Sequence, residues 1–156
     1  MTIEIERVNE PTGELAALIG ELDGALGASY EPHQRHGLSL AQLFAPHMRF
    51  FIARYDGTAA GCGGVALFDD FAEVKRMYTR PELRGRGLAT ALLQRIEQET
   101  RTAGKATLRL ETGPYQHEAI GLYRRMGFVA CGAFGAYATM PARNIAMSVF
   151  FEKRLA

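Results

Sequence analysis

Residues 74–90 read VKRMYTRPELRGRGLAT, and this segment decides the fold of the chain. Residues 72–79, which include its first part, alternate and carry bulky β-favouring side chains, which predicts a strand. Arg80-Pro81 ends this strand, because proline fixes φ and lacks the N–H that a sheet requires. From Leu88 to Ile96 apolar residues recur at helical spacing. The segment is therefore predicted to run strand, basic turn and helix.

The basic turn places two arginines beside two glycines where the helix begins: Arg84, Gly85, Arg86 and Gly87. The first N–H groups of a helix have no intrahelical partner, and the helix dipole favours negative charge there. Glycine lets a phosphate approach the backbone, and arginine adds charge-assisted hydrogen bonds. The turn is therefore predicted to bind a phosphate-bearing ligand.

Length and composition indicate one domain spanning residues 1–156, long enough to bury a core. The 47% hydrophobic and 22% charged content is typical of a soluble globular protein. The arginines of residues 80–101 are an alternative basic patch for nucleic acid, but the net charge of +1 argues against a nucleic-acid binder. The N-terminus does not resemble a signal peptide, and no apolar run reaches membrane-spanning length. We expect a cytoplasmic protein with no membrane contact.

The two cysteines, Cys62 and Cys131, lie in apolar strand-like runs without the spacing of metal ligands. Neither has a histidine nearby in the sequence, which argues against a cysteine nucleophile. These observations favour a reduced intracellular protein with no zinc site.

The remaining chain predicts a mixed sheet. Periodicity and turn residues indicate strands at 2–8, 48–54, 59–68, 72–79, 106–111, 128–134 and 145–153, and helices at about 15–26, 38–44, 88–103 and 116–126. Asp56-Gly57 is a favoured hairpin turn, and the glycines of residues 61–64 predict a bulge or a close backbone approach. The helical crossover implies that the fourth and fifth strands are parallel. We therefore predict an α/β fold with about seven mostly antiparallel, twisted strands, parallel at strands four and five, and helices on both faces.

Two motifs carry a family resemblance. Arg84-x-x-Gly87-x-Ala89 follows the fourth strand, and Ala119-x-x-x-Tyr123-x-x-x-Gly127-Phe128 follows the fifth. Together with the element order, they resemble the GNAT superfamily of acyl-CoA-dependent N-acyltransferases over residues 2–155. Segments such as GCGGVALF at 61–68 and SVFFEK at 148–153 further resemble a bacterial branch labelled YsnE-like or indole-3-acetate acetyltransferase-like. The resemblance implies the GNAT fold.

The resemblance also implies acetyl-CoA as the acyl donor. Backbone N–H groups from Gly85 to Ala89 would hold the pyrophosphate, and the main chain of 77–79 would pair with the pantetheine arm as a pseudo-strand. In the family the fourth and fifth strands splay beside this arm, and Gln116 stands where an asparagine is common. The residues assigned to this site are Met77, Tyr78, Thr79, Arg84, Gly85, Arg86, Gly87, Leu88, Ala89, Thr90, Gln116 and Tyr123.

Acetyl transfer to an amine needs a base, an oxyanion donor and an acid for the thiolate. By resemblance Tyr123 is the general acid, Glu73 takes the amine proton through water, and the oxyanion donor is a main-chain N–H near Met77. The alternatives are a core-packed Tyr123 and a Glu73 in a surface ion pair with Lys75 or Arg76. Glu111 is a second candidate base.

The acceptor site is predicted in the loop at 28–37 and the connection at 135–144. The candidates are Tyr30, His33, His36, Arg76, Glu111, Phe134 and Tyr137. A histidine there is a further candidate base, because imidazole is the side chain whose ordinary pKa lies nearest to neutrality. An arginine facing this pocket would indicate an acceptor with a carboxylate. A His-x-x-His metal site lacks a third ligand, so no metal is predicted.

These features predict an acetyl-CoA-dependent N-acetyltransferase that acts on a primary amine of a small molecule or peptide, by direct transfer in a ternary complex. Two alternatives stay open: an acyl-CoA-binding sensor module without turnover, and a protein-modifying acetyltransferase. A homodimer is a further expectation, because the last strands of this family often pair or swap between subunits.

Overall fold

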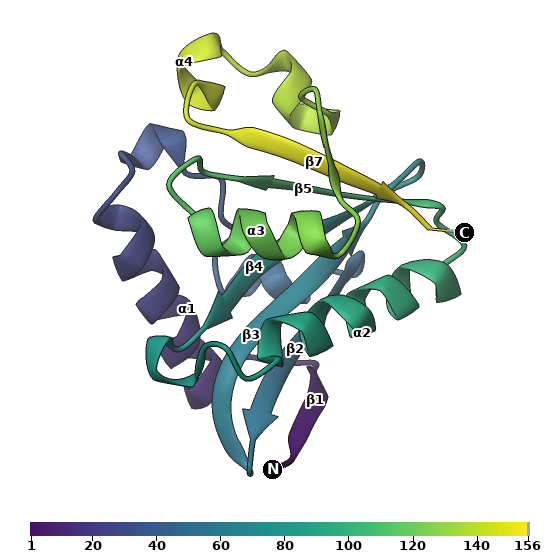
Figure 1. Ribbon diagram of the computed structural model, residues 1–156. Helices are drawn as coiled ribbons and strands as arrows, with labels where there is room; N and C mark the ends of the chain where they lie inside the picture. The colour runs from purple at the N-terminus through teal and green to yellow at the C-terminus, as the bar shows by residue number, and fades with distance from the viewer. Residues whose placement is uncertain (156) are drawn as a thin grey trace.

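A computed structural model describes residues 1–155, which form one seven-stranded mixed sheet with helices on both faces (Figure 1). The strands lie in the order β1-β2-β3-β4-β5-β7-β6, and all neighbours are antiparallel except β4 and β5. Their bounds are β1 Ile3–Val8, β2 Met48–Tyr55, β3 Thr58–Leu67, β4 Ala72–Thr79, β5 Thr107–Thr112, β6 Val129–Cys131 and β7 Val149–Arg154. The helices are α1 Gly13–Gly27, α2 Leu88–Thr102, α3 His117–Arg125 and α4 Ala142–Ile145. The predicted fold class is confirmed.

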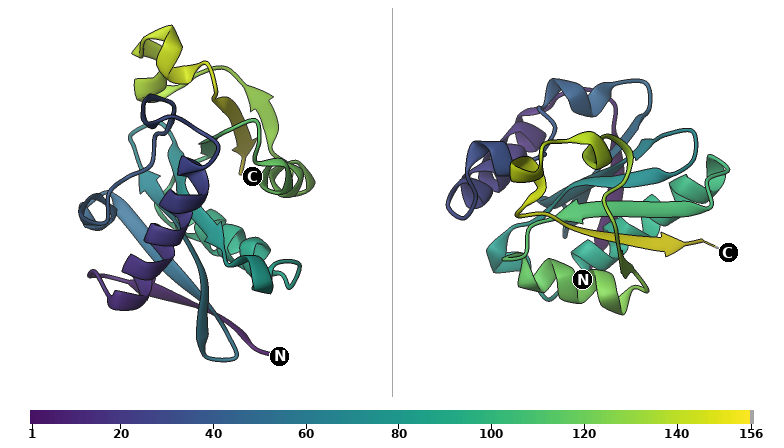
Figure 2. Two further views of the ribbon diagram at one scale, coloured as in Figure 1. Left: turned by 90° about the vertical axis from the view of Figure 1, so that its left-hand side faces the viewer. Right: turned by 90° about the horizontal axis from the view of Figure 1, so that it is seen from above.

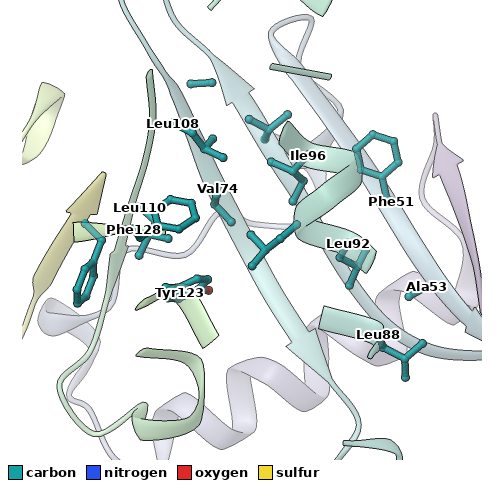
Figure 3. Packing of buried hydrophobic residues seen from close by; sticks show 14 of the residues in the cluster. Phe51, Ala53, Val74, Leu88, Leu92, Ile96, Leu108, Leu110, Tyr123 and Phe128 are labelled. Carbon is teal, nitrogen blue, oxygen red and sulfur yellow. The ribbon is translucent and has the colours of Figure 1, made fainter. Parts of the chain in front are cut away.

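Alternation along β2 divides the core between the two faces of the sheet. Phe50 and Ile52 face α1, whereas Phe51 and Ala53 face α2. Figure 2 shows α1 and α2 on opposite sides of the strands. Figure 3 shows how Leu92 and Ile96 of α2 approach the strands on the second face, while Tyr123 of α3 packs near Phe128 in the same cluster. Each helix therefore buries one apolar stripe against the sheet.

The parallel strands β4 and β5 diverge soon after they meet (Figure 1). They pair only at Ala72 with Leu108 and at Glu73 with Arg109. Beyond Glu73, β4 has no strand partner on this edge within residues 1–155. On its other edge the register with β3 shifts between Cys62 and Gly64, opposite Arg76, whose φ is +57°. The divergence and the bulge leave main-chain groups of β4 available to a ligand.

The glycines of β3 provide the close approach that the sequence predicted. A Cβ atom at Gly61 would lie 2.5 Å from the carbonyl oxygen of Tyr78, and one at Gly64 would lie 2.6 Å from that of Arg49. At Gly63 a Cβ atom would overlap the sulfur of Met77. The three glycines therefore allow β2 and β4 to pack against this strand.

Replacing Gly64 by alanine is expected to lower the free energy of unfolding by about 1–3 kcal/mol, because the Cβ atom overpacks a rigid backbone. Urea unfolding measures the change. The matched control is Gly20→Ala, on an open face of α1, where alanine is expected to be neutral or stabilising. A Gly64→Ala protein as stable as the wild type would contradict this packing.

Three predicted elements differ from the structure. The predicted strand 128–134 is only Val129–Cys131, because the chain leaves the sheet so that Phe134 can pack on Tyr137 and Phe150. The predicted helix at 38–44 is a 3₁₀ turn over Ala41–Phe44. The predicted strand 145–153 begins at Val149, since Ile145 ends α4.

The segments outside the sheet and main helices contain further short turns. Residues 135–144 form a 3₁₀ turn at Gly135–Thr139 followed by α4, where the sequence indicated only a connection. The other 3₁₀ turns are Pro32–Gln34 and Pro81–Leu83. The turn at Asp56-Gly57 has positive φ at both residues, as a favoured two-residue hairpin requires.

Candidate active site

The turn before α2 presents a row of free backbone donors. Gly85 and Gly87 have φ values of +78° and +88°, a region that favours glycine. A Cβ atom at Gly85 would meet nothing within 4 Å, so conformation rather than space requires the glycine there. Within the described chain the N–H groups of residues 85–90 have no hydrogen-bond partner, and the first helical bond runs from Ala91 to Gly87 at 3.0 Å. This arrangement suits a phosphate group.

The two arginines of the turn differ in position. Arg84 donates from Nε to the carbonyl oxygen of Thr79 at 3.1 Å, which ties the turn to the end of β4. Its Nη1 lies 3.8 Å from Glu118 of α3. Arg86 is exposed and lies over the ring of Tyr55, 5.2 Å from its centre. The turn is thus anchored to β4 while its N–H groups stay free.

A cavity of about 120 Å³ lies where β4 and β5 diverge. Its wall combines side chains from α1, the loop after it, β4, β5, α3 and the connection after β6. Nine of the residues selected from the sequence line it: Tyr30, His36, Glu73, Arg76, Met77, Glu111, Gln116, Tyr123 and Tyr137. The divergence of the strands therefore brings the predicted catalytic and acceptor residues together.

Other predicted residues lie elsewhere. His33 is exposed and does not line this cavity. Phe134 lines a second cavity of about 570 Å³, which shares Glu73, Lys75 and Tyr137 with the first. The side chain of Tyr78 points to α1, where its hydroxyl donates to Glu21 at 3.1 Å, so only its main chain can serve a ligand on the opposite edge.

Tyr123 is both a core residue and part of the cavity wall. Its side chain is 5% exposed, and its ring meets Phe128 edge to face at 5.7 Å. Figure 3 shows it between α3 and the diverging strands. Burial, and next the charge of Glu111, raise the pKa of Tyr123. The phenol therefore keeps its proton at neutral pH.

Glu73 belongs to a buried triad with Lys75 and Tyr137. Its Oε2 accepts from the Tyr137 hydroxyl at 2.7 Å and lies 2.9 Å from Lys75 Nζ, which also donates to the Tyr137 hydroxyl at 3.0 Å. The ion pair with Lys75 forms as the sequence suggested, but it is not at the surface, since Glu73 is only 4% exposed. Both contacts use Oε2, so Oε1 has no partner within residues 1–155.

From the sequence, Lys75 is predicted only as an ion-pair partner of Glu73. Lys75 stands two residues after Glu73 on β4, and residues two apart on a strand lie on the same face. That spacing is the sequence signal that places Lys75 at the site beside Glu73. Tyr137 joins them from a segment 64 residues away. Burial and the neighbouring Glu73 raise the pKa of Tyr137, which keeps it a hydrogen-bond donor.

The remaining wall residues are fixed by hydrogen bonds. Glu111 accepts from the Ser148 hydroxyl at 2.6 Å, and burial raises the pKa of this carboxyl group. The Tyr30 hydroxyl accepts from the N–H of Tyr115 at 2.9 Å. His36 donates from Nε2 to the carbonyl oxygen of Asn144 at 2.7 Å and so joins the loop after α1 to α4. The acceptor side of the cavity is thus closed by two distant segments.

Comparison with known proteins assigns this architecture to a family. A model described as the Acetyltransferase (GNAT) family matches residues 16–128. The chain belongs to the GNAT family. The match includes the turn before α2 and ends at Phe128 of the second motif, so both motifs lie inside it.

Relatives of GNAT type cover nearly the whole chain. An "IAA acetyltransferase" of Azospirillum brasilense is 42% identical over 155 residues, 98% of each protein. The "Uncharacterized N-acetyltransferase YsnE" of Bacillus subtilis is 31% identical over 96% of this chain and 98% of that protein. The crystal structure of a proposed acyl-CoA N-acyltransferase from Klebsiella pneumoniae is 36% identical, with a TM-score of 0.82 over 99% of this chain and 98% of the other. The resemblance to this branch and to N-acyltransferases is confirmed.

Further features of this GNAT chain concern its cysteines, its histidines and its helices. Cys62 and Cys131 are both free thiols, and burial raises the pKa of Cys62 to about 12. Within residues 1–155 no group of three His, Cys, Asp or Glu side chains is placed to hold a metal ion. None of the helices in that range combines the length and the apolar character that crossing a bilayer requires.

Proposed function

We propose that this GNAT protein transfers an acetyl group from acetyl-CoA to a primary amine of a small molecule, directly, in a ternary complex. The observation that carries the proposal is the continuity of three features: the free donors at residues 85–90, the open edge of β4 and the cavity lined by Tyr123. Bound acetyl-CoA supplies the activated acyl group. The cavity then accepts the amine from the side of the sheet that α1 covers.

The chain's own groups divide the binding work. The N–H groups of residues 85–90 bind the pyrophosphate at the positive end of α2, and Arg84 and Arg86 add charge nearby. Main-chain groups of Met77, Tyr78 and Thr79 pair with the pantetheine arm as an added strand. Gln116, at the start of α3, lines the cavity and has an amide available to the same arm.

Proton transfer uses groups on the cavity wall. Glu73 takes a proton from the acceptor ammonium through its uncommitted Oε1, while Lys75 and Tyr137 hold the carboxylate in place. Tyr123 donates its proton to the departing thiolate. A main-chain N–H of β4 near Met77 stabilises the developing oxyanion. Glu111 is the second candidate base, because burial moves its pKa toward the range in which a base works at neutral pH.

Two measurements together test the proposal. Thiol release from acetyl-CoA is followed with a panel of primary amines and, in a separate reaction, with IAA, which the name of the Azospirillum brasilense relative contains. Calorimetry measures CoA binding by the same protein. Binding with amine-dependent thiol release and an acetylated product supports an enzyme. Binding without turnover on any amine would instead favour a sensor module, and no CoA binding would contradict both.

Replacing Glu73 by glutamine is expected to lower kcat by about 100-fold, because a positioned base contributes at least that much. The size of the side chain is kept, so CoA affinity should not change. Glu111→Gln is the matched comparison, since this carboxyl group lies on the opposite strand of the same cavity. A loss of rate in Glu111→Gln, with Glu73→Gln unaffected, would assign the base to Glu111.

A further inference from the structure

Two arginines of the cavity each have a donor that nothing in the structure satisfies. Arg35, in the loop after α1, and Arg76, on the bulge of β4, both line the cavity. Within residues 1–155 the Nε atoms of Arg35 and Arg76 are shielded from solvent and lack a hydrogen-bond partner. The Arg76 side chain is only 4% exposed. Buried donors are nearly always paired in folded proteins, so these two atoms indicate a missing acceptor group.

The charges of the wall are unevenly paired. Lys75 is already engaged by Glu73, and Glu111 is held by Ser148. Arg76 uses Nη2 to reach Asp23 at 2.5 Å, but that carboxylate is more than half exposed. Arg35 forms no ion pair in the part of the chain that the structure describes. Of the arginines that line the cavity, Arg35 is therefore the one whose charge has no ionic partner among the described residues.

The backbone is shaped to keep Arg76 in this place. Its φ of +57° is unusual for a residue other than glycine, and such conformations concentrate at functional sites. A Cβ atom at Gly37 would overlap the Arg76 guanidinium, so the loop after α1 covers it only because residue 37 is glycine. The arginine is thus enclosed by α1, the loop and β4 rather than extended into solvent.

We infer that the acceptor carries a carboxylate as well as its amine, and that Arg35 and Arg76 bind this carboxylate through their free Nε donors. A guanidinium presents a planar set of donors that matches a carboxylate, and such charge-assisted bonds are among the strongest in proteins. The amine then lies toward Glu73 and Glu111, on the same cavity wall. The acceptor class is therefore an amino acid or a related amino carboxylic acid. This inference rests on the proposed function and specifies its acceptor.

The test uses pairs of amines that differ only by the carboxylate: alanine with ethylamine, and phenylalanine with phenethylamine. β-Alanine and 4-aminobutyrate extend the spacing between the two groups. In the pair that the wild type uses better, kcat/KM for the amino acid is expected to be at least ~10-fold higher than kcat/KM for the amine without the carboxylate. In Arg35→Gln and Arg76→Gln this ratio falls toward one. The exposed Arg101→Gln on α2 is the matched control and keeps the wild-type ratio.

A binding measurement separates this inference from the function itself. Calorimetry on the CoA-saturated protein compares N-acetylalanine with N-ethylacetamide as product mimics. If the wild type binds N-acetylalanine but not N-ethylacetamide, and Arg35→Gln does not bind N-acetylalanine, the carboxylate site is supported. This result would hold even if no amine of the panel is acetylated. Equal rates within every pair, or an acid preference that survives in both arginine variants, would overturn it. Because Arg76 is buried, circular dichroism checks whether the Arg76→Gln protein folds. If Arg76→Gln unfolds, the result for Arg35→Gln decides the test alone.

Discussion

Replacing Tyr123 by phenylalanine is expected to lower kcat by about 100- to 1,000-fold while the Kd for CoA stays within about twofold of the wild type. The substitution removes one hydroxyl from the cavity wall and keeps the ring that packs on Phe128. Because burial and the charge of Glu111 raise the pKa of Tyr123, the wild-type phenol carries its proton throughout the neutral range. Steady-state kinetics and calorimetry on the same preparation measure the two quantities.

The control for this variant is Tyr115→Phe. Tyr115 is exposed and does not line the cavity, and it contacts Tyr30 through its main-chain N–H and its stacked ring, both of which phenylalanine keeps. Its replacement is expected to leave kcat unchanged. If Tyr123→Phe keeps the wild-type kcat across the pH range in which the enzyme is stable, Tyr123 is only a core residue and another group protonates the thiolate.

Replacing Gly87 by valine is expected to raise the Kd for CoA by at least ~10-fold. A β-branched residue at a φ of +88° is strained by about 1–3 kcal/mol, and the turn relieves that strain by changing shape. The N–H groups of Leu88, Ala89 and Thr90 then lose their common direction. Calorimetric titration with CoA measures the effect, and circular dichroism shows whether the variant folds.

Gly24→Val is the matched control, because Gly24 lies in α1 on an open face where a Cβ atom meets nothing within 4 Å. This variant loses some helix stability but should bind CoA as the wild type does. An unchanged Kd in a folded Gly87→Val protein would show that the turn before α2 does not hold the pyrophosphate.

The central segment could be predicted because its signals are local. Pro81 ends a strand, Gly85 and Gly87 adopt positive φ, and apolar spacing starts α2 at Leu88. The crossover from β4 through α2 to β5 then fixes a parallel pair by length and handedness alone. The fold class and the conformation of the turn before α2 follow from such short-range rules, so the sequence was sufficient for both.

The acceptor side depends on contacts that sequence periodicity does not record. Tyr137 reaches Glu73 across 64 residues, and His36 reaches Asn144 across 108. The segment containing Tyr137 folds as a 3₁₀ turn because Phe134 and Tyr137 pack on Phe150, not because of its own propensity. For the same reason the shortness of β6 and the position of Arg35 beside Arg76 in the cavity wall emerged only from the structure.

The most direct test of the account is a crystal structure of the protein with acetyl-CoA bound. We predict that the pyrophosphate accepts hydrogen bonds from the N–H groups of residues 85–90, that the pantetheine arm pairs with β4 beyond Glu73, and that the thioester sulfur lies beside the Tyr123 hydroxyl. A pyrophosphate bound away from α2, or a sulfur outside the cavity between β4 and β5, would contradict the central claim.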